Sequence, residues 1–434
     1  MNFDKLRKRI VEQAIRGQLV PQVRGEHFLS PGPYEIPQTW RWVRLAEIAT
    51  NIEYGTSVKC HDLPGEQDIP VIRMGNIQNG KLNFQKLKFA PRNSVDLPKL
   101  ILEDGDIVFN RTNSRELVGK CAVFFGGGKE FSFASYIIRA RVHEQEPVYI
   151  SEYINSDLCR STQILPFVTQ QVGQANFNGT KLKNILIPLP PLEEQARIVE
   201  KLKEVFAEID RAEKAYQELQ TLSSVLRGQI LQEAIQGKLV PQLDSEEEVQ
   251  QIGDAPEDVP FAIPEKWKWF TLGSVIEYGK CNQLAGNEIS SETWVLDLED
   301  IEKNTGRILD KKRGVSTTSN KNKFEEGFVL YSKLRPYLNK VVIADESGVC
   351  TTEIVPIDVA SAKVPLLARY LQCYLMSPLF LNHANQASYG VKMPRLGTKD
   401  ARSALIPIPP IEEQKRIVDK IEDLLKQVDA LSGR

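Results

Sequence analysis

The sequence has little of what catalytic and metal-binding proteins use. Its 434 residues include only four histidines and six cysteines, and no two of the cysteines lie close together. This spacing excludes a zinc finger or zinc ribbon, and so few scattered histidines argue against a histidine-based catalytic site. Phosphate-loop, zinc-protease, serine-hydrolase and dinucleotide-binding motifs are all missing. The chain is therefore expected to bind rather than to catalyse, and to carry no cofactor or metal of its own.

Long apolar stretches are also missing. No run approaches the roughly 18 apolar residues of a membrane span, and the N-terminus is charged rather than an apolar signal core. Disulfides are not expected in a chain of this size without a secretory signal. These features predict a protein of the cytoplasm.

Charge is unevenly distributed, although the net charge is only −2. Residues 43–183 hold 17 Lys and Arg against 15 Asp and Glu, and residues 266–402 hold 19 against 15. By contrast, the connector 242–264 has seven acidic residues and no basic one. Two mildly basic segments beside an acidic connector are compatible with nucleic-acid binding, although an ordinary enzyme domain would often look the same.

The chain is one unit written twice. LRKRIVEQAIRGQLVPQ at 6–22 returns as LRGQILQEAIQGKLVPQ at 226–242, with 10 of 17 positions identical. LIPLPPLEEQARIVEKLKEVFAEID at 186–210 returns at 405–429 with 13 of 25 identical. Ile36-Pro37 with Trp40 and Trp42 returns as Ile263-Pro264 with Trp267 and Trp269. Two copies are too few for a solenoid, so a pseudo-twofold arrangement is expected.

The second repeated block predicts long helices. Residues 192–237 contain no proline, and their apolar residues are spaced four and three apart, as in a coiled-coil seam. The seam residues are Ile198, Leu202, Val205, Ile209, Ala212, Tyr216 and Leu219. Each helix follows a Pro-Pro pair and opens with Glu-Glu, which favours a helix N-terminus. Residues 192–237 are expected to pack antiparallel against 411–434, and residues 2–17 to complete the second arm, because the repeat is circularly permuted.

The segments between the repeated blocks predict mixed α/β modules. Short strand-like runs at 70–74, 106–109, 136–138, 327–331 and 340–343 alternate with turn residues. The expected fold class is mixed α+β, with two recognition domains separated by a long antiparallel two-helix coiled coil. The expected division is an N-terminal helix at 1–22, a first domain at 30–190, a central helix at 191–242, a second domain at 255–408 and a C-terminal helix at 409–434.

Polar and basic residues cluster in corresponding loops of the two modules, around 110–115 and 170–178 in the first and 332–340 and 392–395 in the second. Residues 102–111 align with 324–333, and 178–181 with 396–399. Arg pairs bidentately with guanine and Asn or Gln with adenine, although some of these side chains would serve phosphates only. The candidate DNA-binding residues are Arg73, Asn76, Arg111, Asn113, Ser114, Arg115, Gln174, Asn176, Lys181, Lys333, Arg335, Tyr337, Lys340, Lys392, Arg395 and Lys399.

The blocks LIPLPPLEEQARIVEKL and LIPIPPIEEQKRIVDKI, with AIRGQLVPQ, AIQGKLVPQ and the two IP…W.W segments, resemble the DNA-specificity subunit of type I restriction–modification enzymes. NRTNSRELVGK and KLRPYLNK are similar to stretches of that family's target-recognition domains. The resemblance implies two such domains held apart by antiparallel helices, each domain reading one half of a bipartite DNA target.

The same resemblance implies partners that carry the chemistry. Two adenine-methylating modification subunits and two ATP-driven restriction subunits would assemble on the chain, and S-adenosylmethionine, ATP and magnesium would belong to them. The alternatives are a coiled-coil structural or interaction protein, or the specificity part of a fused restriction–methylation enzyme. The second needs an N-P-P-Y-type motif, which these residues lack.

Overall fold

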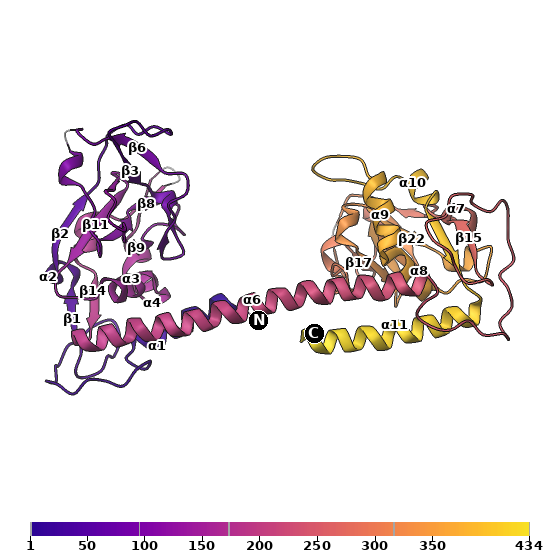
Figure 1. Ribbon diagram of the computed structural model, residues 1–434, viewed down its shortest axis with the longest axis horizontal. Helices are drawn as coiled ribbons and strands as arrows, with labels where there is room; N and C mark the ends of the chain where they lie inside the picture. Colours follow the sequence, from indigo (N-terminus) through magenta and orange to yellow (C-terminus); the bar gives the residue numbers. More distant parts are fainter. Residues whose placement is uncertain (1, 95, 172–173, 316, 434) are drawn as a thin grey trace. The chain divides into compact units, whose positions relative to one another are not determined.

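The computed structural model describes residues 2–94, 96–171, 174–315 and 317–433. It divides into two compact units, Met1–Lys214 and Ala215–Arg434, which are called unit 1 and unit 2 below. Each unit holds a module of mixed strands and helices together with one part of the long helix α6 (Leu192–Ile235) (Figure 1). The mixed α/β prediction is confirmed. Because the boundary between the units falls inside α6, the separate central segment 191–242 stays a prediction.

Unit 1 contains short strands and helices ahead of α6. They are α1 (Phe3–Ile15), β1 (Arg41–Arg44), α2 (Leu45–Ile48), β2 (Ala49–Tyr54), β3 (Asp68–Ile72), β4 (Ile77–Gln78), β5 (Lys81–Leu82), β6 (Lys88–Pro91), β7 (Ile107–Asn110), β8 (Thr112–Asn113), β9 (Cys121–Val123), β10 (Ser132–Phe133), β11 (Ile137–Val142), α3 (Pro147–Asn155), α4 (Asp157–Cys159), β12 (Thr169–Gln171), β13 (Gln174–Asn176), α5 (Gly179–Lys183) and β14 (Leu186–Leu189).

The main sheet of unit 1 runs in the order β2-β11-β7-β9, with antiparallel neighbours. Phe109 and Ile138 of this sheet share one core with Tyr149 of α3 and Ile198 of α6. The smaller sheets of the described part of unit 1 are β10-β3-β6, β12-β13-β8, β1-β14 and β4-β5. The strand predicted at 70–74 is shifted: β3 ends at Ile72, and a 3-10 turn at Met74–Asn76 follows.

Unit 2 repeats this plan with altered strands. Its elements after α6 are β15 (Lys268–Thr271), α7 (Leu272–Val275), β16 (Gln283–Leu284), β17 (Trp294–Leu296), β18 (Lys321–Phe324), β19 (Val329–Ser332), β20 (Val341–Ile343), β21 (Gly348–Thr351), β22 (Ile354–Ile357), α8 (Ala368–Met376), α9 (Pro378–Ala387), α10 (Thr398–Arg402), β23 (Leu405–Ile408) and α11 (Ile411–Ser432). Its sheets run β20-β19-β22, β16-β18-β21-β17 and β15-β23. Val329, Tyr370 and Ile417 belong to one core that joins the sheet, α8 and α11.

The repeated AI.G.LVPQ block encodes a helix end. In α6, Gly237 N donates to Ala234 O at 3.2 Å and Lys238 N donates to Glu233 O at 3.0 Å, which is the Schellman arrangement with glycine in the left-handed position. After α1, Gly17 N donates to Ala14 O in the same way. Both glycines have φ +70°. The same local sequence therefore stops both helices by the same hydrogen bonds.

In unit 1, α1 runs antiparallel to the first half of α6. Arg7, near the start of α1, donates to Asp210 at 2.6 Å and to Glu213 at 2.7 Å. At the other end, Arg197 donates to Pro21 O at 2.9 Å. In unit 1, therefore, the N-terminal helix is the antiparallel partner of α6, and the expectation that it completes the arm formed by residues 411–434 stays a prediction.

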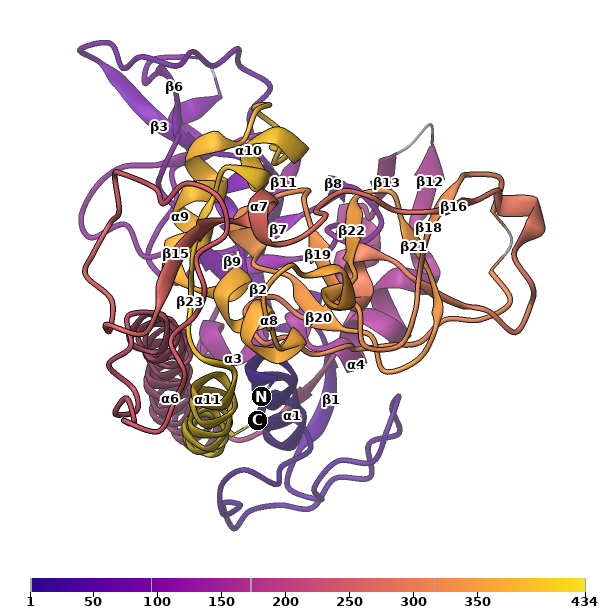
Figure 2. The same cartoon turned by 90° about the vertical axis from the view of Figure 1, so that its right-hand side faces the viewer.

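In unit 2, α11 runs antiparallel to the second half of α6. Gln220 donates to Ser432 O at 3.3 Å, Arg227 pairs with Asp429, and Arg416, near the start of α11, donates to Pro241 O at 3.0 Å. Figures 1 and 2 both show α11 alongside this part of α6. The predicted antiparallel helix pairing is confirmed for this half. No helix in the described ranges is long and apolar enough to cross a membrane.

The predicted seam is correct at one end of α6 only. Ile198, Leu202 and Ile209 are buried, but Ala212 is exposed and Leu219 is 37% exposed. From Ser223 onward the buried side is set by residues outside the predicted seam, including Arg227. The apolar residues Ile230, Leu231, Ala234 and Ile235 are buried here as well, and the polar Arg227 is covered because it pairs with Asp429 of α11.

A buried tryptophan joins each module to the helix that follows it. Trp40 Nε1 donates to Glu194 Oε1 at 3.0 Å, and Trp267 Nε1 donates to Glu413 Oε2 at 2.9 Å. All four side chains are at most 1% exposed. Both glutamates of each pair lie in the first turn of their helix, as the Glu-Glu interpretation expects, and the second one has a further role. The second is a buried acceptor for tryptophan, and burial raises the pKa of Glu413.

The glutamine that follows each of these glutamates is buried as well. Gln195 Nε2 donates to Pro190 O at 2.8 Å, and its Oε1 accepts from Glu146 N at 3.0 Å. Gln414 makes the equivalent bonds to Pro409 O and from Leu367 N, both at 2.9 Å. The EEQ motif thus fastens the last strand, the helix start and the module together in each unit.

Replacing Gly237 by alanine is expected to lower the free energy of unfolding by about 2 to 4 kcal/mol, because a left-handed L-residue and an overpacked contact both cost energy. A Cβ at this position would lie 2.3 Å from Pro264 Cγ. Gly228, inside α6, is the matched control: its Cβ would meet only Pro378 Cγ at 3.7 Å, and alanine there should stabilise the helix by up to about 1 kcal/mol. Urea unfolding measures both. A Gly237→Ala variant as stable as the wild type would contradict this account.

Candidate nucleic-acid interface

In unit 1 the small sheet β12-β13-β8 gathers candidates from two distant loops. Ala175 pairs with Asn113 and Asn176 pairs with Thr112, and Phe177 N donates to Arg111 O at 2.8 Å. Ser114, Arg115 and Gln174 are exposed, and Asn113 and Asn176 are half-buried. The structure therefore brings the 110–115 and 174–176 segments into one polar surface. Val172 and Gly173, which belong to the predicted 170–178 loop, lie outside the described residues.

Arg111 is held from one side by an aromatic ring. Its guanidinium carbon lies 4.8 Å from the centroid of the Tyr54 ring, a cation–π contact. The Tyr54 hydroxyl accepts from Gly179 N at 2.7 Å, which ties the ring to the start of α5. The Arg111 Nε is buried and has no partner among the described residues. The ring contact fixes the guanidinium at the edge of the polar surface, and a ligand would have to bind its other two nitrogens, because Nε is buried.

Sequence reasoning missed Tyr54, although a signal for it exists. Ile52-Glu53-Tyr54-Gly55 returns as Ile276-Glu277-Tyr278-Gly279, so this short block is part of the repeat. In unit 2 the equivalent Tyr278 is 2% exposed, and its ring packs 6.4 Å from the Tyr331 ring, centroid to centroid. The repeated tyrosine supports a loop in unit 1 and a core in unit 2.

Three other candidates of unit 1 differ in their surroundings. Arg73 is exposed after β3. Lys181 Nζ donates to Phe167 O at 2.7 Å and to Thr169 Oγ1 at 2.8 Å, so it braces β12. The structure does not support Asn76 as a DNA-binding residue. Asn76 is 5% exposed, its amide nitrogen donates to Asn83 O and Gln85 O, and its oxygen accepts from Arg73 N. Both of its donors are used inside the protein, so Asn76 shapes a turn.

In unit 2 the corresponding surface forms where β19 ends. Leu396 N donates to Lys333 O at 3.0 Å and Arg335 N donates to Pro394 O at 2.7 Å, so the 333–335 and 389–396 segments lie side by side. Arg335, Lys392 and Lys399 are exposed, and Tyr337 is 52% exposed. Lys333, Arg335 and Lys392 have no carboxylate partner within the described part of the chain. Their charges are therefore available to an anionic ligand.

Two candidates of unit 2 are engaged inside the protein. The Arg395 guanidinium pairs with Glu353 at 2.9 Å, and this hydrogen bond raises its pKa. Lys340 Nζ donates to Leu298 O at 2.6 Å, and burial lowers the pKa of Lys340. That Lys340 lies on the DNA face stays a prediction, but its ammonium group already binds a backbone carbonyl of the module.

The two surfaces correspond, with one change to the predicted alignment. The match of 102–111 with 324–333 is confirmed, because Gly105 N donates to Phe124 O as Gly327 N donates to Ala344 O. The match of 178–181 with 396–399 is wrong by one residue. Asn178 caps α5 and Gly397 caps α10, so Asn178 corresponds to Gly397 and Lys181 to Asp400. Lys399 is not the counterpart of Lys181.

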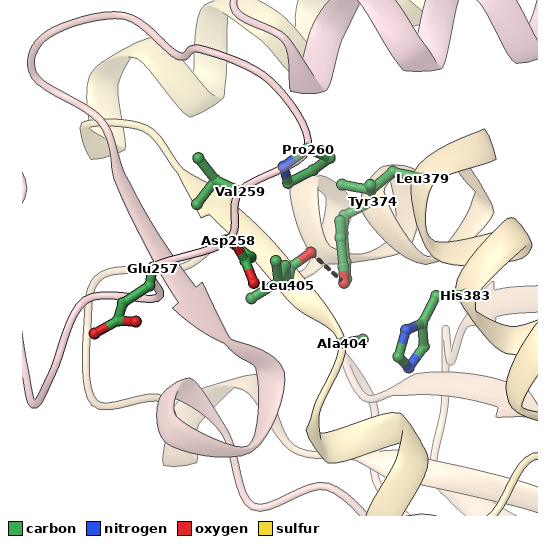
Figure 3. Close-up of a pocket in the computed structure, with 9 residues that line it drawn as sticks. All are labelled: Glu257, Asp258, Val259, Pro260, Tyr374, Leu379, His383, Ala404 and Leu405. Carbon is green, nitrogen blue, oxygen red and sulfur yellow. Dashed lines mark hydrogen bonds between the residues drawn. The ribbon is translucent and has the colours of Figure 1, made fainter.

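A separate cavity of about 460 Å³ lies in unit 2 under the acidic connector (Figure 3). Glu257 and Asp258 line one side of it, and His383 and Tyr374 line the other. The Tyr374 hydroxyl donates to Leu405 O at 2.9 Å, and His383 Nε2 lies 2.7 Å from Asp400 O. The acidic side is unsuited to phosphate. No cluster of three His, Cys, Asp or Glu side chains that could hold a metal occurs among the residues described.

Comparison with known proteins agrees with this geometry. The family described as "Type I restriction modification DNA specificity domain" matches residues 37–221 and 264–434, once for each module. The chain is 27% identical over 340 residues to the specificity subunit of the type I restriction enzyme EcoDI of Escherichia coli, covering 71% of this chain and 72% of that protein. It is 25% identical over 426 residues to the StySPI specificity subunit of Salmonella potsdam, covering 92% and 84%.

Solved structures show the same fold. The HsdS subunit from Thermoanaerobacter tengcongensis is similar with a TM-score of 0.51 and 22% identity over 92% of each chain. A chain from a structure describing complex assembly and conformational transition of the type I R-M system has a TM-score of 0.62 and 20% identity, covering 92% of this chain and 93% of that one.

Proposed function

The chain belongs to the family of type I restriction–modification DNA specificity subunits, and from this premise we propose that each unit reads one half of a bipartite, asymmetric DNA target. One observation carries the proposal. The two units share a hydrogen-bonded framework, in which Phe177 N binds Arg111 O and Leu396 N binds Lys333 O. On that framework, however, unit 1 presents amides together with Arg111 and Arg115, whereas unit 2 presents lysine, arginine and apolar side chains. Two modules that share a framework but present different side chains are suited to reading two different half-sites.

The partners follow from the same proposal. DNA and the modification and restriction subunits of a type I system are the partners of such a subunit, and we propose two copies of each protein partner. This chain would then contribute recognition and scaffolding without catalysis, while S-adenosylmethionine, ATP and magnesium serve the partner subunits. The cytoplasm, where the DNA is, is the expected compartment. Neither the comparisons nor the fold supports the two alternatives considered from the sequence.

Exchanging one module tests the proposal. Residues 30–190 would be replaced by the first module of another specificity subunit, and the variant co-expressed with the modification subunit. Sequencing of methylated adenines is expected to show one half of the target changed and the other half and the spacer retained, because the framework of each unit is self-contained. The reciprocal exchange of 255–408 is the matched control. A change in both halves after either exchange would count against independent reading.

A further inference from the structure

The segment Tyr389–Arg395 of unit 2 is a closed hairpin that follows α9. Tyr389 N donates to Arg395 O at 3.1 Å, and Arg395 N donates back to Tyr389 O at 2.9 Å. Gly390 has φ +97° at the turn. The Arg395–Glu353 ion pair fastens one side of the base, and the bond from Arg335 N to Pro394 O fastens the other. The hairpin is thus held at its base from both sides, whereas Val391 near its tip is exposed to solvent.

The hairpin carries exposed apolar side chains, of which only Val391 is fully exposed. Val391 is 101% exposed, Tyr389 63% and Met393 44%. Lys392 stands between the two aliphatic side chains, and Lys333 and Arg335 lie on the adjoining segment. Apolar groups on a braced hairpin among unpaired cations indicate a partner that is anionic overall and has apolar groups within reach.

Unit 1 has different chemistry at the same place. The β-bridge between Arg395 and Leu334 in unit 2 matches the pairing of Asn176 with Thr112 of β8 in unit 1. Met393 lies two residues before Arg395, as Gln174 lies two residues before Asn176. Met393 therefore occupies the position of Gln174. An amide in one unit is replaced by a thioether in the other, on the same hydrogen-bonded frame. This substitution changes the base-edge group that the position can contact.

We propose that Val391 and Met393 contact thymine methyl groups in the major groove of the half-site bound by unit 2. This rests on the proposed function and names the bases that the hairpin favours. The C5-methyl of thymine is the apolar group on the major-groove edges of the bases. Insertion between bases would instead require unstacking, which costs a few kcal/mol per step. Lys392 would bind a flanking phosphate.

The test uses the complex of this chain with its modification subunit and the target found by methylation mapping. Each thymine of the unit 2 half-site is replaced in turn by uracil, which lacks only the methyl group. Wild-type affinity is expected to fall about fourfold at one or two positions, the effect of losing one buried methyl. The double variant Val391→Ala/Met393→Ala should bind thymine and uracil DNA equally. Leu309→Ala, at a side chain 62% exposed elsewhere in unit 2, is the control and should keep the difference.

Several results would overturn the proposal. They are uracil tolerated at every thymine of the half-site, or a double variant that still distinguishes thymine from uracil. Fluorescence of 2-aminopurine that rises beside the contacted step would show insertion instead. If the double variant no longer bound the modification subunit in the absence of DNA, the hairpin would be a binding site for that protein and not for DNA. Failure of the proposed function is a distinct result, because the wild-type complex would then methylate no bipartite sequence.

Discussion

Replacing Trp267 by alanine is expected to lower the free energy of unfolding of unit 2 by about 3–5 kcal/mol, the range for large-to-small core substitutions of aromatic residues. Trp267 is 1% exposed, and its Nε1 donates to the buried Glu413. The alanine variant leaves a cavity and also leaves a carboxylate whose one remaining side-chain donor among the described residues is Gln242, at 3.3 Å. Urea unfolding followed by tryptophan fluorescence and far-ultraviolet circular dichroism measures the loss.

Two phenylalanine variants separate the hydrogen bond from the packing. Trp267→Phe removes the donor to Glu413 and should cost about 1–3 kcal/mol, the cost of leaving a buried polar group unsatisfied. Trp269→Phe is the matched control, because the Trp269 Nε1 is buried without a partner among the described residues. Its replacement removes the same ring volume without breaking a hydrogen bond, and should therefore cost less than Trp267→Phe. Equal losses in the two variants would show that the bond to Glu413 contributes nothing.

The repeats predicted much of the scaffold because they are local signals. Residues 192–237 were expected to be helical, and α6 runs from Leu192 to Ile235 and stops at Gly237. Helix length, its start after Pro-Pro and its end at glycine depend on neighbouring residues alone. The burial of Ser223 and Arg227 was not predicted, because it depends on a partner helix about 200 positions away in the sequence.

The Trp–Glu pairs show the same limit. Both Trp40 and Glu194 stand in repeated blocks, so the sequence marks them as parts of the scaffold, but 154 positions separate them. A buried carboxylate also contradicts the usual surface position of glutamate. Only the fold shows that the indole supplies the donor that makes this burial tolerable.

For the DNA surface, the sequence identified the loops better than the side chains. The 110–115 and 332–340 loops do end corresponding strands, but composition could not distinguish free from engaged polar groups. Asn76 and Lys340 are of the same residue types as Asn113 and Lys333, yet their hydrogen bonds go to backbone carbonyls. Tyr54 was missed because its role depends on the packing of Arg111 over its ring. Whether a polar side chain is available to a ligand depends on the tertiary structure around it.

Replacing Arg111 by alanine is expected to weaken binding of the specific target by about 1–3 kcal/mol and to relax one base position of the half-site bound by unit 1, as for an arginine that reads a base. Arg111 is half-buried and held over Tyr54, so its direction is defined before DNA binds. Arg115 is exposed and has no ion pair in the described part of the chain. Arg115→Ala should therefore weaken all sequences alike, as for a phosphate contact.

Salt dependence distinguishes these two roles. The logarithm of the association constant falls with the logarithm of salt concentration by about 0.9 for each phosphate neutralised. Arg115→Ala should reduce this slope by about 0.9, whereas Arg111→Ala should change the preferred base and leave the slope nearly intact. Lys340→Met is the matched control: the Lys340 ammonium is bound to Leu298 O, so its removal should change neither quantity. If Lys340→Met weakened specific binding as much as Arg111→Ala, the DNA surface would extend to the far side of β19, and the assignment of reading residues from free donors would be wrong.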